Sequence, residues 1–177
     1  MSAAVKALEK NFRKELNRTL RAAEWEKVLA TAAKTHFPTA DVRHTGGPNE
    51  AGADIEIILP NPFGGTPWIV VVQVKDYEGQ VGDHVVGQLR DAVNTRKERG
   101  HVIGAVLAST NAHPSRELHE AISVFEQELG VPVTVMHGDE FMKMILRGVV
   151  QYGALIVDGS TWVGPAETQL PGDQLRR

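Results

Sequence analysis

The sequence contains no cysteine among its 177 residues. Disulfide bonds and thiolate metal sites are therefore excluded, and the composition fits a reducing compartment. No apolar run reaches the roughly 20 residues of a membrane-spanning helix, and the first residues lack the apolar segment of a signal peptide. These absences predict a cytoplasmic protein, and the length is that of a single domain with short extensions.

Several catalytic signatures are missing as well. The seven histidines show no HExxH or similar spacing, and His44 is one of several that are scattered along the chain, so a zinc site is not expected. No GxSxG segment is present, which together with the lack of cysteine leaves no basis for a covalent hydrolase. The net charge of −3 argues mildly against a protein that coats nucleic acid by bulk electrostatics.

Positive charge is nevertheless concentrated near the start of the chain. Residues 3–22 predict an amphipathic helix, because apolar side chains recur there at steps of three and four residues. Lys10, Lys14 and Arg18 lie on a roughly opposite arc of this helix. They are candidates for contacts with nucleic-acid phosphates, and a solvated outer face is the alternative.

The most informative stretch is a predicted β-hairpin. Residues 53–59 and 68–75 are rich in isoleucine and valine, and the proline, asparagine and glycine between them favour a sharp turn. Strands joined in this way are antiparallel. The hairpin therefore brings Asp54, near the start of its first strand, beside Gln73 and Lys75 at the end of its second.

The face of the second strand suggests what these three residues do. Side chains alternate across a strand, so Gln73 and Lys75 share one face. A lysine at the end of a run of valines is costly to bury unless an opposite charge compensates it. A carboxylate at Asp54, alone or holding a divalent cation, would supply that compensation.

The segment GAD at residues 52–54, followed by QVK at residues 73–75, resembles the catalytic hairpin of the PD-(D/E)xK nuclease superfamily. The GxD and QxK pattern is similar to that of its Mrr-like restriction endonuclease branch. Gln73 stands where most members of the superfamily carry Asp or Glu, whereas glutamine is usual in the Mrr-like branch. The resemblance implies an α/β fold with the αβββαβ core of restriction endonucleases, in which helices flank a mixed central sheet.

The sequence outside the hairpin predicts the other helices and strands that this fold requires. The predicted elements are a helix at 23–35, a strand at 41–45, a helix at 82–99, a strand at 101–108, a helix at 115–129, a strand at 131–136 and a short helix at 140–146. Strands that alternate with helices after residue 68 imply parallel pairing through right-handed crossovers.

This interpretation divides the chain into three parts. Residues 1–22 are an N-terminal amphipathic helical extension, residues 23–150 the nuclease domain, and residues 151–177 a C-terminal extension or tail. One more strand is predicted in the tail, at residues 154–157.

The resemblance indicates two further acidic residues as candidates for the site. The first core helix of Mrr-like domains carries an acid beside an aromatic residue, and here that pattern selects Glu26, with Glu24 as the second choice. Glu50 lies in the region where Mrr-like sequences often place an extra acid before the GxD. A plain surface carboxylate is the alternative for each of them.

The implied chemistry is phosphodiester hydrolysis with a divalent cation, which activates water and stabilises the charged transition state. Mg²⁺ prefers oxygen ligands, and the resemblance implies Mg²⁺ or Mn²⁺ here. Asp54, the side-chain oxygen of Gln73 and the backbone carbonyl of Val74 would bind the ion, and Glu26 or Glu50 would complete its ligand set.

Lys75 would orient the attacking water or neutralise charge on the phosphate. Gln73 carries one negative charge fewer than the usual carboxylate, which would weaken cation binding unless another acid restores it. The sequence therefore predicts a metal-dependent DNA endonuclease of Mrr-like type, with Asp54, Gln73, Lys75 and Glu26 as its catalytic residues.

A homodimer is expected, because one small catalytic domain cuts one strand and a symmetric pair cuts two. No separate recognition domain is visible, so a partner protein could supply specificity. Three alternatives stay open: a structure-selective nuclease that resembles a Holliday-junction resolvase, a catalytically inactive DNA-binding or assembly module of the same fold, and an unrelated α/β domain.

Overall fold

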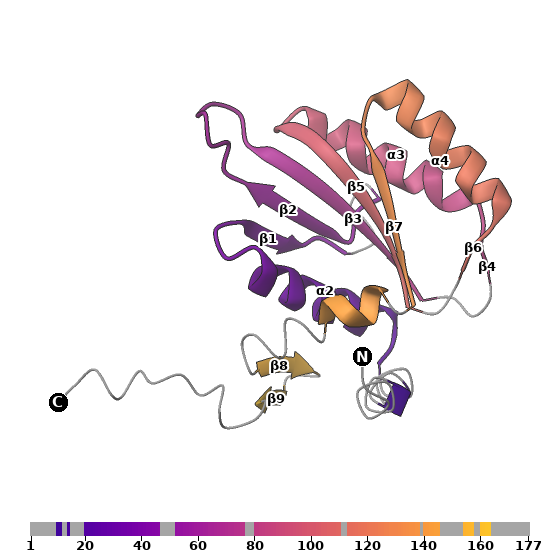
Figure 1. The fold of residues 1–177 in the computed structure, drawn as a ribbon. Helices are drawn as coiled ribbons and strands as arrows, with labels where there is room; N and C mark the ends of the chain where they lie inside the picture. The colour runs from indigo at the N-terminus through magenta and orange to yellow at the C-terminus, as the bar shows by residue number, and fades with distance from the viewer. Residues whose placement is uncertain are drawn as a thin grey trace.

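A five-stranded mixed sheet forms the centre of the molecule (Figure 1). The computed structural model describes residues 10–11, 14, 20–46, 52–76, 80–110, 113–138, 140–145, 154–157 and 160–163. The strands are β1 (Asp41–His44), β2 (Ile55–Leu59), β3 (Trp68–Lys75), β5 (His101–Ser109) and β7 (Val133–His137), in the order β1-β2-β3-β5-β7. The first three strands are antiparallel neighbours, and β3, β5 and β7 are parallel.

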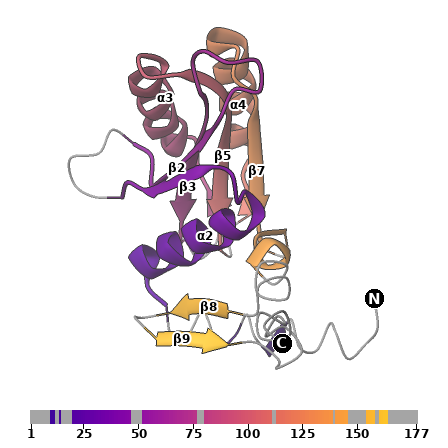
Figure 2. The same cartoon turned by 90° about the vertical axis from the view of Figure 1, so that its left-hand side faces the viewer.

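Helices cover both faces of this sheet. The three longest described helices are α2 (Ala22–His36), α3 (His84–Lys97) and α4 (Arg116–Leu129). In Figures 1 and 2, α3 and α4 lie together on one side of the strands and α2 lies on the other. Residues 140–145 are helical and pack with α2, where the ring of Phe141 meets that of Trp25 edge-on at a centroid distance of 5.3 Å.

The alternation of side chains along β3 separates two hydrophobic cores. Val72 and Val74 belong to the core beneath α2, whereas Val71 belongs to the core beneath α3 and α4. Gln73 has the same parity as Val71 and is only 4% exposed. The central strand is therefore buried on both faces, as expected for a strand with helices on either side.

The elements expected between residues 23 and 145 are present, with ends that differ by one or two residues. The mixed sheet, the antiparallel hairpin and the parallel crossover strands all match the predicted α/β architecture. Helix α4 begins behind Ser115, whose side chain accepts a hydrogen bond from the Leu118 amide, and ends at Gly130 in the left-handed conformation.

The helix predicted at residues 3–22 does not reach its predicted end. Leu20 and Arg21 are not helical, because Leu20 is buried in the core beneath α2 and the extended backbone of Arg21 caps α2. The carboxylate of Glu24 accepts a hydrogen bond from the Arg21 amide. Among the earlier residues, Lys10 and Lys14 are helical and exposed, while Arg18 lies outside the described residues.

Two further sheets have two strands each. β4 (Gln80–Val81) pairs in parallel with β6 (His113–Pro114), and both strands are too short for a periodic sequence signal. The strand predicted at 154–157 is present as β8 (Ala154–Val157) and pairs with β9 (Ser160–Val163), which was not predicted. Both views place this hairpin beyond α2 (Figures 1 and 2). No helix in the described part of the chain is long and apolar enough to cross a membrane.

A buried ion pair attaches α3 to β2. Glu56 and Arg96 are 1% and 3% exposed, and Glu56 Oε1 lies 2.7 Å from Arg96 Nε and 2.5 Å from Arg99 Nη2. Burial raises the pKa of Glu56, but the hydrogen bonds from Arg99 and Arg96 outweigh it and hold the pKa below its ordinary value.

We predict that Glu56→Gln lowers the free energy of unfolding by about 3–5 kcal/mol, because it removes the buried carboxylate charge that pairs with Arg96 and Arg99. The loss is measured by urea unfolding near neutral pH. The lowered pKa means that the ion pair stabilises the fold above the ordinary glutamate pKa and loses this effect as the pH falls through the folded-state value. The gap between the two proteins should therefore narrow in acid.

Glu120→Gln is the matched control, because it removes an exposed pair with Arg116 whose side chains are 64% and 87% exposed. Such a pair contributes at most about 1 kcal/mol. Equal losses from the two substitutions would contradict a special role for the buried pair.

Candidate active site

The hairpin brings Asp54, Gln73 and Val74 into direct contact. In the β2–β3 register Ile55 lies opposite Val72, and the Asp54 amide donates to the Val72 carbonyl at 2.9 Å. Asp54 Oδ2 accepts a hydrogen bond from the Val74 amide at 2.6 Å and another from Gln73 Nε2. The predicted contact between Asp54 and Gln73 is therefore present, and Lys75 acts on Asp54 through its charge.

The Asp54 carboxylate lies in an environment that disfavours its charge. Its pKa is raised to about 6, mainly by burial and to a smaller extent by the nearby charge of Glu26. The Val74 amide, Lys75 and His44 act in the opposite direction but do not cancel the burial. A divalent cation at this carboxylate would relieve the cost.

Lys75 lies beside the carboxylate but is held by another residue. Its Nζ donates a hydrogen bond to Gln88 Oε1 of α3 at 2.7 Å. Burial lowers the pKa of Lys75, whereas the charges of Asp54 and Glu26 oppose that shift. The expected compensation by Asp54 is thus electrostatic, and the contact with Gln88 was not anticipated.

Glu26 reaches the same place from the other side of the sheet. Its Oε2 lies 2.8 Å from His44 Nε2 at the end of β1, and its charge acts on Asp54. Glu24, the other acid considered on this helix, caps the Arg21 amide instead. The geometry therefore selects Glu26 as the acid that α2 contributes.

Gly52, the glycine of the GxD segment, is required by both conformation and space. Its φ is +72°, a region that other residues rarely adopt, and a Cβ at this position would overlap the backbone carbonyl oxygen of Gln88. The loop that leads to Asp54 therefore packs closely against α3, from which Gln88 contacts Lys75.

The donor set fits a divalent cation that prefers oxygen. Gln73 Oε1 is a buried atom with no hydrogen-bond partner among the described residues, and Asp54 presents a carboxylate that burial has destabilised. Within the described part of the chain, no three His, Asp or Glu side chains converge closely enough to hold a metal. Gln73 Oε1 is an oxygen that such a site has available, and Glu50 lies outside the described residues.

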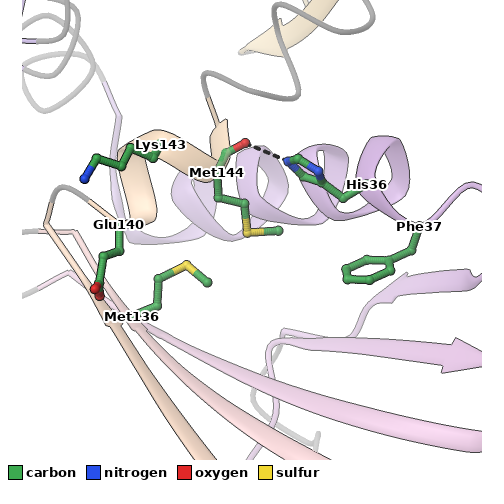
Figure 3. Close-up of a pocket in the computed structure, with 6 residues that line it drawn as sticks. All are labelled: His36, Phe37, Met136, Glu140, Lys143 and Met144. Atoms are coloured by element: carbon green, nitrogen blue, oxygen red, sulfur yellow. Dashed lines mark hydrogen bonds between the residues drawn. The ribbon is translucent and has the colours of Figure 1, made fainter. Parts of the chain in front are cut away.

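A pocket of about 490 Å³ lies elsewhere, at the carboxyl end of α2 (Figure 3). Phe37, Met136 and Met144 line it, and His36 Nε2 lies 2.9 Å from the Met144 carbonyl oxygen across it. None of the candidate catalytic residues contributes to this pocket. A site that acts on a polymer does not need an enclosed cavity.

Sequence reasoning missed His44 and Gln88 as site residues. His44 is the last residue of β1 and pairs with Ile55, next to Asp54, so the β1–β2 register would have revealed it. Gln88 lies in the first half of α3, where the sequence alone has no signal for a contact with Lys75.

The family model Mrr_cat, described as a restriction endonuclease, matches residues 10–145. The match covers most of the chain, and the chain belongs to this restriction endonuclease family. Comparison with curated proteins finds no match.

A solved structure agrees on the fold. The chain is similar to the MspJI restriction endonuclease in complex with a 27-mer oligonucleotide, with a TM-score of 0.53 and 20% identity over 85% of this chain. It is also similar to the restriction endonuclease FokI bound to DNA, with a TM-score of 0.49 and 14% identity over 79% of this chain. It spans 33% of the MspJI chain and 30% of the FokI chain.

We predict that Asp54→Asn stabilises the cation-free protein at pH 7.5 by about 1–3 kcal/mol, because it removes a carboxylate whose pKa burial raises. Above a pH of about 6 the wild-type carboxylate is charged and the folded state bears the full cost. As the pH falls below that value the folded state takes up a proton, so the advantage of Asn should shrink. The measurement is urea unfolding in EDTA across this pH range.

Asp91→Asn, on an exposed position of α3, is the matched control and should leave stability unchanged at every pH. Addition of Mg²⁺ should stabilise the wild type by mass action and leave Asp54→Asn unaffected. An Asn variant that is less stable than the wild type at pH 7.5 would contradict the assignment of a destabilised carboxylate.

Proposed function

We propose that this chain is the catalytic part of a metal-dependent DNA endonuclease that hydrolyses phosphodiester bonds. The observation that carries the proposal is the partly buried Asp54 carboxylate, which is hydrogen-bonded to Gln73 and Val74 and affected by the charges of Lys75 and Glu26, in a chain of the restriction endonuclease family. A domain with a degraded site would be expected to lose Asp54 or Lys75, and both are present.

The cation is Mg²⁺ or Mn²⁺ in this proposal. Asp54, Gln73 Oε1 and Glu26 would hold it, and the Val74 carbonyl and Glu50 are the further candidates. When bound, it supplies positive charge that favours ionisation of water and stabilises the charge on the phosphate. Its affinity should be modest, because Gln73 stands in place of a third carboxylate.

The chain's own residues supply the remaining chemistry. Lys75 presents its ammonium beside Asp54, where it would donate hydrogen bonds to the phosphate oxygens. Gln88 accepts one hydrogen bond from Lys75 and so fixes the direction of the ammonium. Because burial lowers its pKa, Lys75 holds its proton less tightly than an exposed lysine and could pass it to a leaving oxygen.

The substrate and the assembly complete the proposal. DNA is the proposed substrate, and support comes from the family and from the oligonucleotide bound to MspJI. We propose residues 23–150 as the nuclease domain, with 1–22 and 151–177 as extensions, in a homodimer that cuts two strands. Because the chain spans a third of MspJI, residues or a partner outside it would supply specificity. A cytoplasmic location stays a prediction.

We expect the purified protein to nick or cut plasmid DNA with Mg²⁺ or Mn²⁺ and to be inactive in EDTA. Asp54→Ala and Lys75→Ala should each reduce cleavage by about two orders of magnitude or more. The first removes a ligand of the cation, and the second removes a positive charge beside the reacting phosphate. Binding of DNA, measured by fluorescence anisotropy in EDTA, should stay near that of the wild type. Asp91→Ala is the control, and a Lys75→Ala protein that cuts normally would rule out the proposed site.

The N-terminal bases give a separate expectation. Replacing Lys10, Lys14 and Arg18 together with alanine should weaken DNA binding and lower the slope of its salt dependence by about one unit for each lost phosphate contact. Folding should persist, since Lys10 and Lys14 are exposed. Affinity and salt slope equal to those of the wild type would show that these bases only solvate the surface.

A further inference from the structure

Glu26 does not enter the candidate site alone, because an imidazole holds its carboxylate. Glu26 Oε2 lies 2.8 Å from His44 Nε2, and the two side chains are 17% and 32% exposed. The contact needs a hydrogen on Nε2, so the imidazole donates and the carboxylate accepts. Trp25, the residue before Glu26, is fully buried against Phe141 and so fixes the rotation of α2 above β1.

The backbone at Gly46 packs against the pair formed by Glu26 and His44. A Cβ at Gly46 would overlap Glu26 Oε2 and would lie 3.1 Å from His44 Nε2. The chain at residue 46 therefore runs against both groups, and only a glycine leaves room for them. The Oε2 atom of Glu26 is confined by the imidazole and by this backbone, which leaves Oε1 as the oxygen that can face a ligand.

Thr45, between His44 and Gly46, is hydrogen-bonded to the segment that carries Asp54. The Thr45 amide donates to the Asp54 carbonyl oxygen at 2.8 Å, and Thr45 Oγ1 donates to the Ala53 carbonyl oxygen at 2.8 Å. His44 precedes Thr45, so the end of β1 holds the imidazole in a fixed relation to the GxD segment. Both Glu26 and His44 are close enough to act on the charge of Asp54.

We propose that His44 is a positioning residue that holds one oxygen of Glu26 so that the other oxygen completes a divalent-cation site with Asp54. The inference rests on the proposed metal-dependent function. Two carboxylates on neighbouring elements repel each other, and a glutamate on a helix surface can turn toward water. The hydrogen bond from His44 opposes both effects before the cation arrives. Hydrogen-bond partners of metal ligands typically contribute about 10–100-fold to metal affinity.

The test is Mn²⁺ titration calorimetry on the full chain at one fixed pH, with circular dichroism to check folding. We expect His44→Ala to weaken Mn²⁺ binding by about 10–100-fold and His44→Gln, which keeps an N–H donor, to recover most of the affinity. If the alanine variant does not fold, His44→Phe replaces it, because it keeps a ring without the donor. His101→Ala, at an exposed position at the start of β5, should bind like the wild type.

A double-mutant cycle separates positioning from a general structural effect. In a Glu26→Gln background, His44→Ala should cause no further loss of Mn²⁺ affinity, since the carboxylate that it orients is gone. In cleavage assays the His44→Ala protein should lose kcat and keep its KM for DNA. Wild-type Mn²⁺ affinity in His44→Ala, or equal losses with and without Glu26, would overturn this inference alone. A wild-type chain that binds no Mn²⁺ would overturn it together with the proposed function.

Discussion

Two hydrogen bonds to a single oxygen, Asp54 Oδ2, determine the arrangement of the whole site. The Val74 amide and the Gln73 side chain both donate to it, so the carboxylate is held across the hairpin. Without these donors a buried carboxylate would be left unpaired at a cost of several kcal/mol. Their presence allows the chain to keep a charge at the edge of its central sheet, and the pKa of about 6 shows that the cost is only partly met. A site that remains partly uncompensated is suited to bind a cation.

The site also depends on both faces of the sheet. Lys75 contacts Gln88 of α3 on one face, whereas His44 and Glu26 meet on the side of α2. The edge where they approach one another is the carboxyl end of β3, the position at which open α/β sheets usually bind their ligands. Helix α3 starts near that edge, and its N-terminal end favours negative charge.

Rigid anchors hold these two halves in place. The buried Glu56–Arg96 pair fixes α3 to β2 on one face, and the Trp25–Phe141 contact fixes α2 on the other. Trp25 is next to Glu26 in α2, and Arg96 is in the same helix as Gln88, α3. A small shift of either helix would therefore move Glu26 or Gln88. The fold therefore serves the chemistry mainly by limiting the motion of the groups that surround Asp54.

The sequence by itself determined the hairpin, the helices that flank it and the meeting of Asp54 with Gln73, because a tight turn between two short strands leaves only one antiparallel arrangement. The family resemblance rested on these same local residues, and the family match confirms it. Only the tertiary structure decided that Glu26 faces the site while Glu24 caps a helix, and that His44 and Gln88 join them. These residues come from separate elements, and their approach depends on how α2 and α3 pack on opposite faces of the sheet, which no local periodicity records.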